Sequence, residues 1–209
     1  MHRIFALLIG LFLKLSISYS QEFEGIIEYE MTYVPKSYQY TLSFLEKELG
    51  KNVTSYFKNG YYKEITNSNF MGFQLFRHEE NKIYYKHSLK DDTLWYSSTI
   101  AEHNIEFNYE IVENADTILG VSCDKLIYKD SSGTKSYYYS SEYSLDPEYY
   151  RNFTYYNKYE VLKLMRAIYL QFEMETALFK LKVTAINIKR KKLKDRIFRI
   201  PKHKQLVQG

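Results

Sequence analysis

Cysteine is almost absent from this chain, since Cys123 is the only one among its 209 residues. A single cysteine excludes an intramolecular disulfide and offers no partner for a thiolate metal site. We therefore expect Cys123 to be a small buried side chain.

Short motifs that carry catalysis or phosphate binding are also missing. The chain has no G-x-S-x-G elbow for a nucleophilic serine and no glycine-rich run before a lysine and a hydroxyl residue. Its histidines at 78, 87, 103 and 203 are never spaced as i, i+3 or i+4, which disfavours a metal site. We expect no metal, no cofactor and no catalytic residue of a recognisable class. An enzyme is not excluded, because catalytic groups can assemble from distant positions.

Long apolar runs are absent after the first 20 residues. The N-terminus has a basic start (1–3), an apolar run (4–13) and small residues at Ser18 and Ser20. This order is typical of a secretory signal peptide cleaved after Ser20. We expect residues 1–20 to be a signal peptide and 21–209 to form a single β-rich domain.

A strong excess of one charge is missing too. The net charge is +4, and removal of Arg3 and Lys14 with the signal leaves it near +2. Such a balance is too weak for a nucleic-acid binder, so we expect no nucleic-acid partner. The signal predicts an exported protein, and we expect it in the periplasm or outer envelope of a diderm bacterium.

Aromatic residues are abundant where proline is scarce. The chain has 23 tyrosines and 13 phenylalanines against three prolines, a composition that suits strands. Apolar and polar residues alternate with period two, as in a strand with one buried face, in the segments 27–33, 105–111, 168–174 and 179–185. Weaker patterns predict strands near 70–77, 82–87 and 93–98.

Turn residues predict two hairpins. Asn59-Gly60 favours a type I′ turn between strands near 53–58 and 61–66. Ser131-Ser132-Gly133 plays the same part between strands near 122–129 and 134–140.

Helical spacing occurs in one segment. Tyr38, Leu42, Leu45 and Leu49 share one helical face, with Ser37 placed as N-cap and Gly50 as the C-terminal stop. A second short helix near 158–166 is open, because Asn157 and Glu160 have capping-box spacing.

These elements predict a mainly β (α+β) fold. We expect a strongly curved antiparallel sheet or half-barrel of about 10–11 strands, covered by one or two helices.

The apolar face of such a sheet is a candidate ligand site. Its aromatic and methionine side chains either pack as a core or line a concavity for an elongated hydrophobic ligand. The residues that we predict to contact such a ligand are Tyr29, Met31, Phe107, Tyr109, Leu170, Phe172 and Met174.

The basic run Lys189, Arg190, Lys191 and Lys192 is the sharpest charge feature. It is interpreted as a solvated turn between the last two strands, or as a contact with anionic lipid headgroups at a membrane surface.

Four short stretches carry a family resemblance: 23–29, 56–63, 118–123 and 197–201. Their order resembles that of exported bacterial proteins related to the GLPGLI-type and LolA-like (lipoprotein carrier-like) families. The stretch 165–170 departs from the Leu-Pro-Gly or Leu-Pro-Leu of GLPGLI-type members. The resemblance implies a LolA-like half-barrel that holds lipid or lipoprotein acyl chains in its concavity, and it makes 197–201 the closing strand.

Three functions are therefore open. The first is a non-enzymatic envelope protein that binds a lipid or lipoprotein acyl chain. The second is an envelope protein that binds another protein through a tyrosine-rich surface, formed by Tyr137, Tyr138, Tyr139, Tyr149, Tyr150, Tyr155 and Tyr156. The third is an unrecognised hydrolase, which would need a histidine, a carboxylate and a hydroxyl within hydrogen-bond reach.

Overall fold

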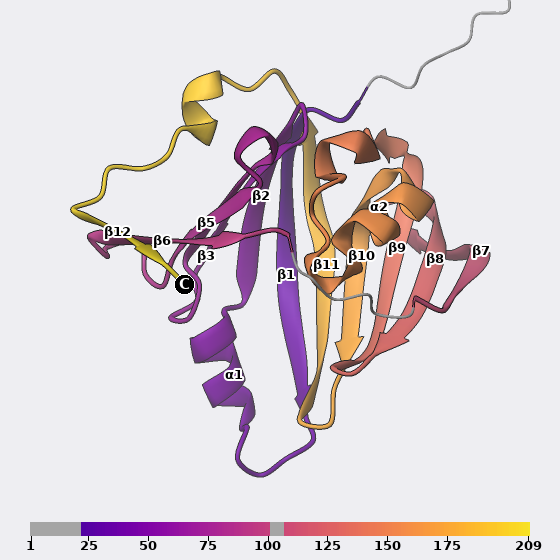
Figure 1. Cartoon of the computed structure of the whole chain (residues 1–209). Coiled ribbons are helices and arrows are strands. Elements are labelled where there is room, and N and C mark those ends of the chain that lie inside the picture. Colours follow the sequence, from indigo (N-terminus) through magenta and orange to yellow (C-terminus); the bar gives the residue numbers. More distant parts are fainter. Residues whose placement is uncertain (1–21, 101–106) are drawn as a thin grey trace, which may run out of the picture.

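The computed structural model describes residues 22–100 and 107–209, which form one large β-sheet bent around a short helix (Figure 1). Its strands are β1 (Gly25–Pro35), β2 (Asn52–Lys58), β3 (Tyr61–Thr66), β4 (Phe73–Arg77), β5 (Lys82–Lys86), β6 (Thr93–Ser98), β7 (Tyr109–Ile118), β8 (Val121–Asp130), β9 (Gly133–Ser144), β10 (Ala167–Glu175), β11 (Phe179–Arg190) and β12 (Gln205–Gln208). The α-helices are α1 (Leu42–Leu49) and α2 (Lys158–Met165). Short 3₁₀ helices occupy η1 (His78–Glu80), η2 (Pro147–Tyr150), η3 (Tyr155–Asn157) and η4 (Asp195–Phe198).

The sheet consists of two local meanders joined at one seam. Its strand order is β12-β6-β5-β4-β3-β2-β1-β11-β10-β9-β8-β7. Strands β1 to β6 follow one another on one side, β7 to β11 follow on the other, and β1 pairs antiparallel with β11 between them. The mainly β prediction is confirmed, but the described sheet has twelve strands instead of 10–11. It is mixed, because β12 pairs parallel with β6.

Most predicted strands are confirmed, and one is wrong in its limits and its burial. The segments 27–33, 168–174 and 179–185 lie within β1, β10 and β11. In the predicted strand 105–111, residues 105 and 106 lie outside the described residues, and β7 begins only at Tyr109. Tyr109 and Ile111 are exposed on β7, which is the last strand of the sheet.

The tight turns follow the predicted backbone chemistry. Asn59 and Gly60 have φ angles of 47° and 77° between β2 and β3, as a type I′ hairpin requires. Leu119 and Gly120 form a similar left-handed pair, with φ of 51° and 81°, between β7 and β8. The sequence did not predict this second turn, because leucine is rarely found at positive φ.

Both helices are present, but the predicted N-cap of α1 is wrong and the predicted capping box of α2 does not form. Helix α1 begins at Leu42, and Thr41, not Ser37, accepts a hydrogen bond from the backbone N–H of Phe44 at 3.3 Å. Gly50 ends this helix with φ of 88°, as predicted. Asn157 precedes α2 in a left-handed conformation and makes no capping hydrogen bond, so the capping box does not form.

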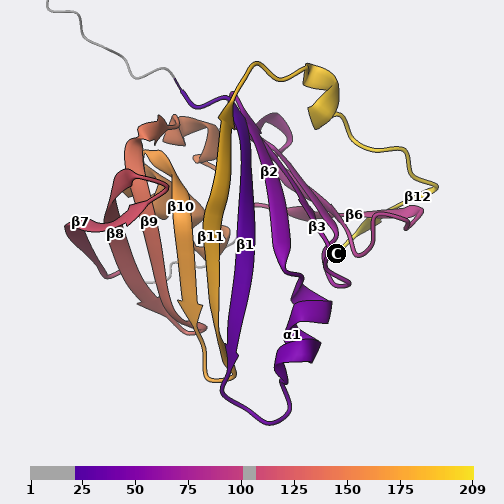
Figure 2. The same ribbon diagram turned by 180° about the vertical axis from the view of Figure 1, so that it is seen from behind.

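The two faces of the sheet are covered by different segments. We call the face that α2 covers the inner face and the opposite face the outer face (Figures 1 and 2). Between the inner face and α2 lies an aromatic core that includes Tyr62, Phe76, Tyr128, Tyr139 and Leu162. On the outer face, the chain after β11 packs over β4 to β6 through Leu193 and Phe198, each 5% exposed.

The end of the chain differs from the prediction. Residues 197–201 do not form the closing strand implied by the family resemblance, because Asp195–Phe198 is a 3₁₀ helix that buries Phe198. The last strand is instead β12, at the edge of the sheet.

No helix in the described ranges 22–100 and 107–209 is long and apolar enough to cross a membrane.

Candidate functional site

A row of polar residues crosses the inner face where its neighbours are mostly apolar. Strand register places Ser55 of β2 beside Glu64 of β3, and Glu64 beside Gln74 of β4. The Ser55 hydroxyl donates to Oε1 of Glu64 at 3.1 Å, and the Gln74 amide lies against the sulfur of Met71. Polar groups on a covered sheet face are costly to desolvate, which makes this row a candidate site.

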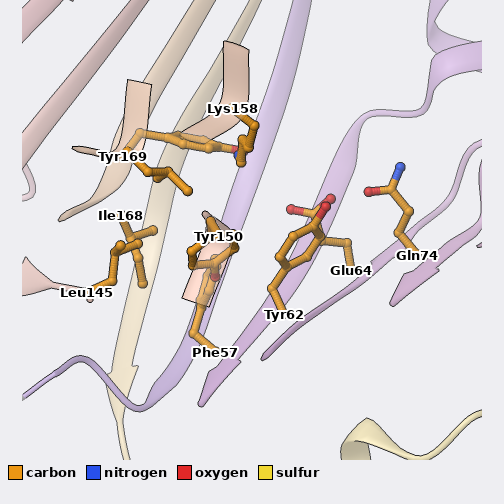
Figure 3. A pocket seen from close by; sticks show the side chains of 10 residues that line it. Phe57, Tyr62, Glu64, Gln74, Leu145, Tyr150, Lys158, Ile168 and Tyr169 are labelled. Atoms are coloured by element: carbon orange, nitrogen blue, oxygen red, sulfur yellow. The ribbon is translucent and has the colours of Figure 1, made fainter. Parts of the chain in front are cut away.

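Glu64 and Gln74 of this row line a cavity beneath α2, which we call the charged pocket (Figure 3). It has a volume of about 130 Å³. Lys158, the first residue of α2, enters it opposite Glu64 and Gln74. The full set of lining residues is Phe57, Tyr62, Glu64, Gln74, Leu145, Tyr150, Lys158, Leu162, Ile168 and Tyr169.

Glu64 and Lys158 carry opposite charges in this pocket without forming an ion pair. No contact within 4.0 Å joins the two charged groups, and the Lys158 Nζ lies 5.9 Å from the centre of the Tyr62 ring. Burial raises the pKa of the Glu64 carboxyl, although the charge of Lys158 and the Ser55 hydroxyl oppose this shift. Burial also lowers the pKa of Lys158, against the attraction of Glu64. Each charge is therefore poorly solvated and lacks a direct partner of opposite sign.

The charged pocket adjoins a wider cavity that we call the apolar groove. The two share Glu64, Gln74 and Tyr169. The groove has a volume of about 350 Å³ and lies over β1, β10 and β11 on the inner face. Its lining residues are Met31, Leu49, Val53, Glu64, Thr66, Ser68, Phe70, Met71, Gln74, Tyr169, Phe172, Met174, Phe179, Leu181 and Val183.

Hydrogen bonds to α1 hold one side of the apolar groove in place. The loop between β3 and β4 contributes Phe70, whose side chain is 56% exposed. Its backbone N–H donates to the carbonyl of Glu48 at 3.0 Å, and the Ser68 hydroxyl donates to the same carbonyl at 2.6 Å. The loop is thereby tied to the end of the helix, and an exposed aromatic ring stands on the groove wall.

Three of the seven predicted ligand contacts line the apolar groove: Met31, Phe172 and Met174. Tyr29 is 1% exposed, and its hydroxyl donates to the carbonyl of Tyr169 at 2.9 Å. Leu170 is fully buried with Cys123 and Tyr138, where the pairing of β10 with β9 shifts register. Neither side chain lines the groove or the charged pocket.

The other two predicted contacts lie away from the groove. Phe107 packs on Tyr128, with ring centres 5.0 Å apart, and stacks on the exposed Tyr109. The structure therefore brings part of the predicted set together and leaves this pair beside the edge strand β7.

The basic run is more engaged with the protein than the sequence indicates. Lys189 and Arg190 belong to β11, so the run is not wholly a turn. Lys189 pairs with Glu28 at 3.1 Å, and Lys192 pairs with Glu24 at 3.3 Å. The Arg190 guanidinium lies 5.2 Å from the ring centres of Phe23 and Tyr143, whereas Lys191 is exposed.

The tyrosine-rich segments contribute more to the core than to the surface. Tyr138, Tyr139 and Tyr150 are at most 8% exposed, whereas Tyr155 and Tyr156 are 48% and 57% exposed. The segment 137–139 thus has no freely exposed face for a protein partner.

Histidines and acidic clusters offer little for catalysis in the described part of the chain. No histidine lines the charged pocket or the apolar groove, and the Nδ1 atoms of His87 and His203 lie at hydrogen-bond distance from backbone carbonyls. Within residues 22–100 and 107–209, no group of three or more His, Cys, Asp or Glu side chains could hold a metal ion. His103 lies outside the described residues.

Sequence reasoning missed Glu64 and Lys158. Both faces of β3 mix polar and apolar residues, with Tyr62 and Glu64 on one and Lys63 and Ile65 on the other. No period-two signal therefore shows which face is covered. Lys158 could not be assigned either, because only the tertiary structure places the start of α2 over β3.

Comparison with known proteins does not assign a family. No protein-family model matches the chain, and no curated protein matches it. Among solved structures, an uncharacterized conserved protein from Thermus thermophilus is similar, with a TM-score of 0.49 and 10% identity, over 89% of this chain and 91% of that one. PNGF-II is similar with a TM-score of 0.46 and 13% identity, over 88% of this chain but only 31% of its own. At these scores, neither likeness indicates a function.

Proposed function

We propose that this protein is a non-enzymatic carrier or sensor of a hydrophobic ligand, and that it binds a lipid or lipoprotein acyl chain along the inner face of its sheet. The proposal includes export to the periplasm or outer envelope and a LolA-like half-barrel with its ligand in the concavity. The observation that supports it is the apolar groove, a cavity of about 350 Å³ that includes the predicted contacts Met31, Phe172 and Met174.

The lining of the groove suits a flexible chain. Methionine is unbranched and polarizable, and the groove has three such side chains, at Met31, Met71 and Met174. Burying an acyl chain contributes about 0.8 kcal/mol per methylene, so six buried methylenes would contribute about 5 kcal/mol. Even partial insertion would therefore give useful affinity.

The exposed ring of Phe70 favours a binding surface over a sealed core. A large aromatic side chain that is 56% exposed on the wall of an apolar cavity leaves apolar surface in contact with water. A bound chain would cover part of that surface.

The direct test is to express the full chain in a bacterial periplasm, purify it without detergent, extract it with organic solvent and identify bound lipids by mass spectrometry. We expect an acyl-chain ligand in stoichiometric amount. A stable protein that carries no lipid would count against a carrier.

A matched pair of variants tests the location of the site. Met31→Trp fills the groove, whereas Glu30→Trp places the same ring on the outer face of the same strand, at an exposed position outside the groove. With N-phenyl-1-naphthylamine as a neutral fluorescent probe, we expect Met31→Trp to weaken binding about tenfold, equivalent to losing the burial of about two methylenes. Glu30→Trp should bind like the unaltered protein. Equal binding by both variants would place the ligand elsewhere.

A further inference from the structure

The apolar groove adjoins the charged pocket, and the two cavities differ in the chemistry of their lining residues. Glu64 and Gln74 line both cavities, whereas the three methionines line only the groove and Lys158 lines only the charged pocket, beside apolar side chains such as Leu162. A ligand lying along both cavities would therefore place an apolar chain in one and a polar group in the other.

Both charged groups in the pocket have unused hydrogen-bonding capacity. The Lys158 ammonium can donate three hydrogen bonds, but it makes none with any residue in the ranges 22–100 and 107–209. The Glu64 carboxylate has about four acceptor positions, of which the described residues fill one, through the Ser55 hydroxyl. The pocket thus offers a strong donor and a strong acceptor on opposite walls.

We infer that the charged pocket recognises a neutral polar group that carries one acceptor and one donor, and that the ligand is an acyl chain joined to its head through a secondary amide. The amide carbonyl accepts from Lys158, and the amide N–H donates to Glu64. This inference rests on the proposed function, because it assigns the polar end of the same ligand.

Charge balance favours an amide over a charged head. Glu64 and Lys158 together are neutral, so a neutral group adds no net charge to a poorly solvated site. A fatty-acid carboxylate would stand beside Glu64, and an alkylammonium would stand beside Lys158; like charges in such a medium repel strongly.

The volume of the charged pocket also favours a small group such as an amide. A volume of about 130 Å³ admits a small planar group. It is small beside the 300–1,000 Å³ that is typical of sites for larger ligands, so a bulky sugar or phosphocholine head does not suit it.

The experiment compares four compounds that have the same ten-carbon chain and different polar groups: N-methyldecanamide, methyl decanoate, decanoate and decylammonium. Each compound competes with N-phenyl-1-naphthylamine for binding to the full-length protein. We expect the amide to bind about tenfold more tightly than the ester, because only the amide donates to Glu64 and a hydrogen bond to a charged group is worth about that factor. The two charged probes should bind less tightly than the amide.

Two variants should reorder the series. Glu64→Gln leaves Lys158 without its opposite charge, so decanoate should become the preferred probe. Lys158→Met leaves Glu64 alone, so decylammonium should become preferred. A purely structural role for the two residues would change all four affinities alike. Binding of the fluorescent probe in the groove reports whether each variant is folded.

The outcomes separate the two proposals. If no decyl compound displaces the fluorescent probe, the hydrophobic carrier and its amide head are both wrong. If all four displace it but the unaltered protein binds amide and ester equally, the carrier stands and the amide is overturned. That comparison needs no variant, so a misfolded variant cannot obscure it.

Discussion

Gly60 shows how a single residue can serve both a turn and a tertiary contact. Its φ of 77° belongs to the hairpin between β2 and β3, and a Cβ at this position would lie 2.3 Å from the ring of Tyr149. Gly120 has nearly the same backbone, with φ of 81°, but no atom within 4 Å of such a Cβ. A comparison of substitutions at Gly60 and Gly120 therefore separates the cost of backbone strain from the cost of steric crowding.

We predict that Gly60→Ala lowers the free energy of unfolding by about 2–4 kcal/mol, whereas Gly120→Ala lowers it by about 1 kcal/mol. Both changes force an alanine into a left-handed conformation, but only the first pushes a methyl group into Tyr149. Urea unfolding of the two variants measures the difference. Equal losses would show that Tyr149 moves aside without cost.

At the residue scale, the sequence predicts the role of a residue only where that role depends on neighbours a few positions away in the chain. The Asn59-Gly60 turn and the Gly50 helix stop could be found, because their backbone requirements are met within a few residues. Glu64 and Lys158 are 94 positions apart in the chain, and only the folding of α2 over β3 brings them to one cavity.

Strand β12 is an element that no sequence pattern indicated. It is only four residues long and has no clear alternation, yet it pairs parallel with β6, where Val207 lies beside Trp95. The Gly209 N–H extends this pairing to the carbonyl of Tyr96 at 2.9 Å. Because Trp95 is the single tryptophan of the chain, tryptophan fluorescence reports on this edge of the sheet alone.

We predict that truncation after Lys204 shifts the fluorescence emission of Trp95 to longer wavelength, because removal of β12 exposes the neighbouring strand to water. The free energy of unfolding should fall by only about 1–2 kcal/mol, since few backbone hydrogen bonds are lost. Leu206→Ala is the control: this side chain is 51% exposed, so emission should not change. An unshifted emission in the truncated chain would show that β12 does not cover Trp95.

Strands with strong period-two alternation could be predicted from the sequence, but their positions in the sheet and the burial of their apolar faces could not. β1, β10 and β11 alternate clearly, and their apolar faces are covered. The alternation near 105–111 looks the same in the sequence, but β7 occupies the edge of the sheet, and Ile111 is 41% exposed there. The position of a strand in a sheet depends on distant pairings, which local alternation does not encode.

For the whole molecule, the seam between β1 and β11 decides whether the two meanders unfold together. Ile27, Tyr29 and Ala185 are at most 2% exposed along it. The core under α2 also spans both sides, since Tyr62 belongs to one meander and Tyr139 to the other. These shared contacts favour a single cooperative unit.

We predict that Trp95 fluorescence and far-UV circular dichroism give the same unfolding midpoint in urea. Tyr29→Ala, which opens a cavity at the seam, should lower the free energy of unfolding by about 3–5 kcal/mol and move both midpoints equally. Two separate midpoints, or a shift of only one, would reveal independent halves.

The pairing of Gly25 with Arg190 also has a consequence for synthesis. While the ribosome is still making the second meander, one edge of β1 has no partner strand. More than 150 further residues must be synthesised before β11 can pair with this edge. An open strand edge invites wrong pairing between nascent chains. The growing polypeptide should therefore depend on a chaperone, or on rapid removal from the site of translation, until its last long strand has emerged.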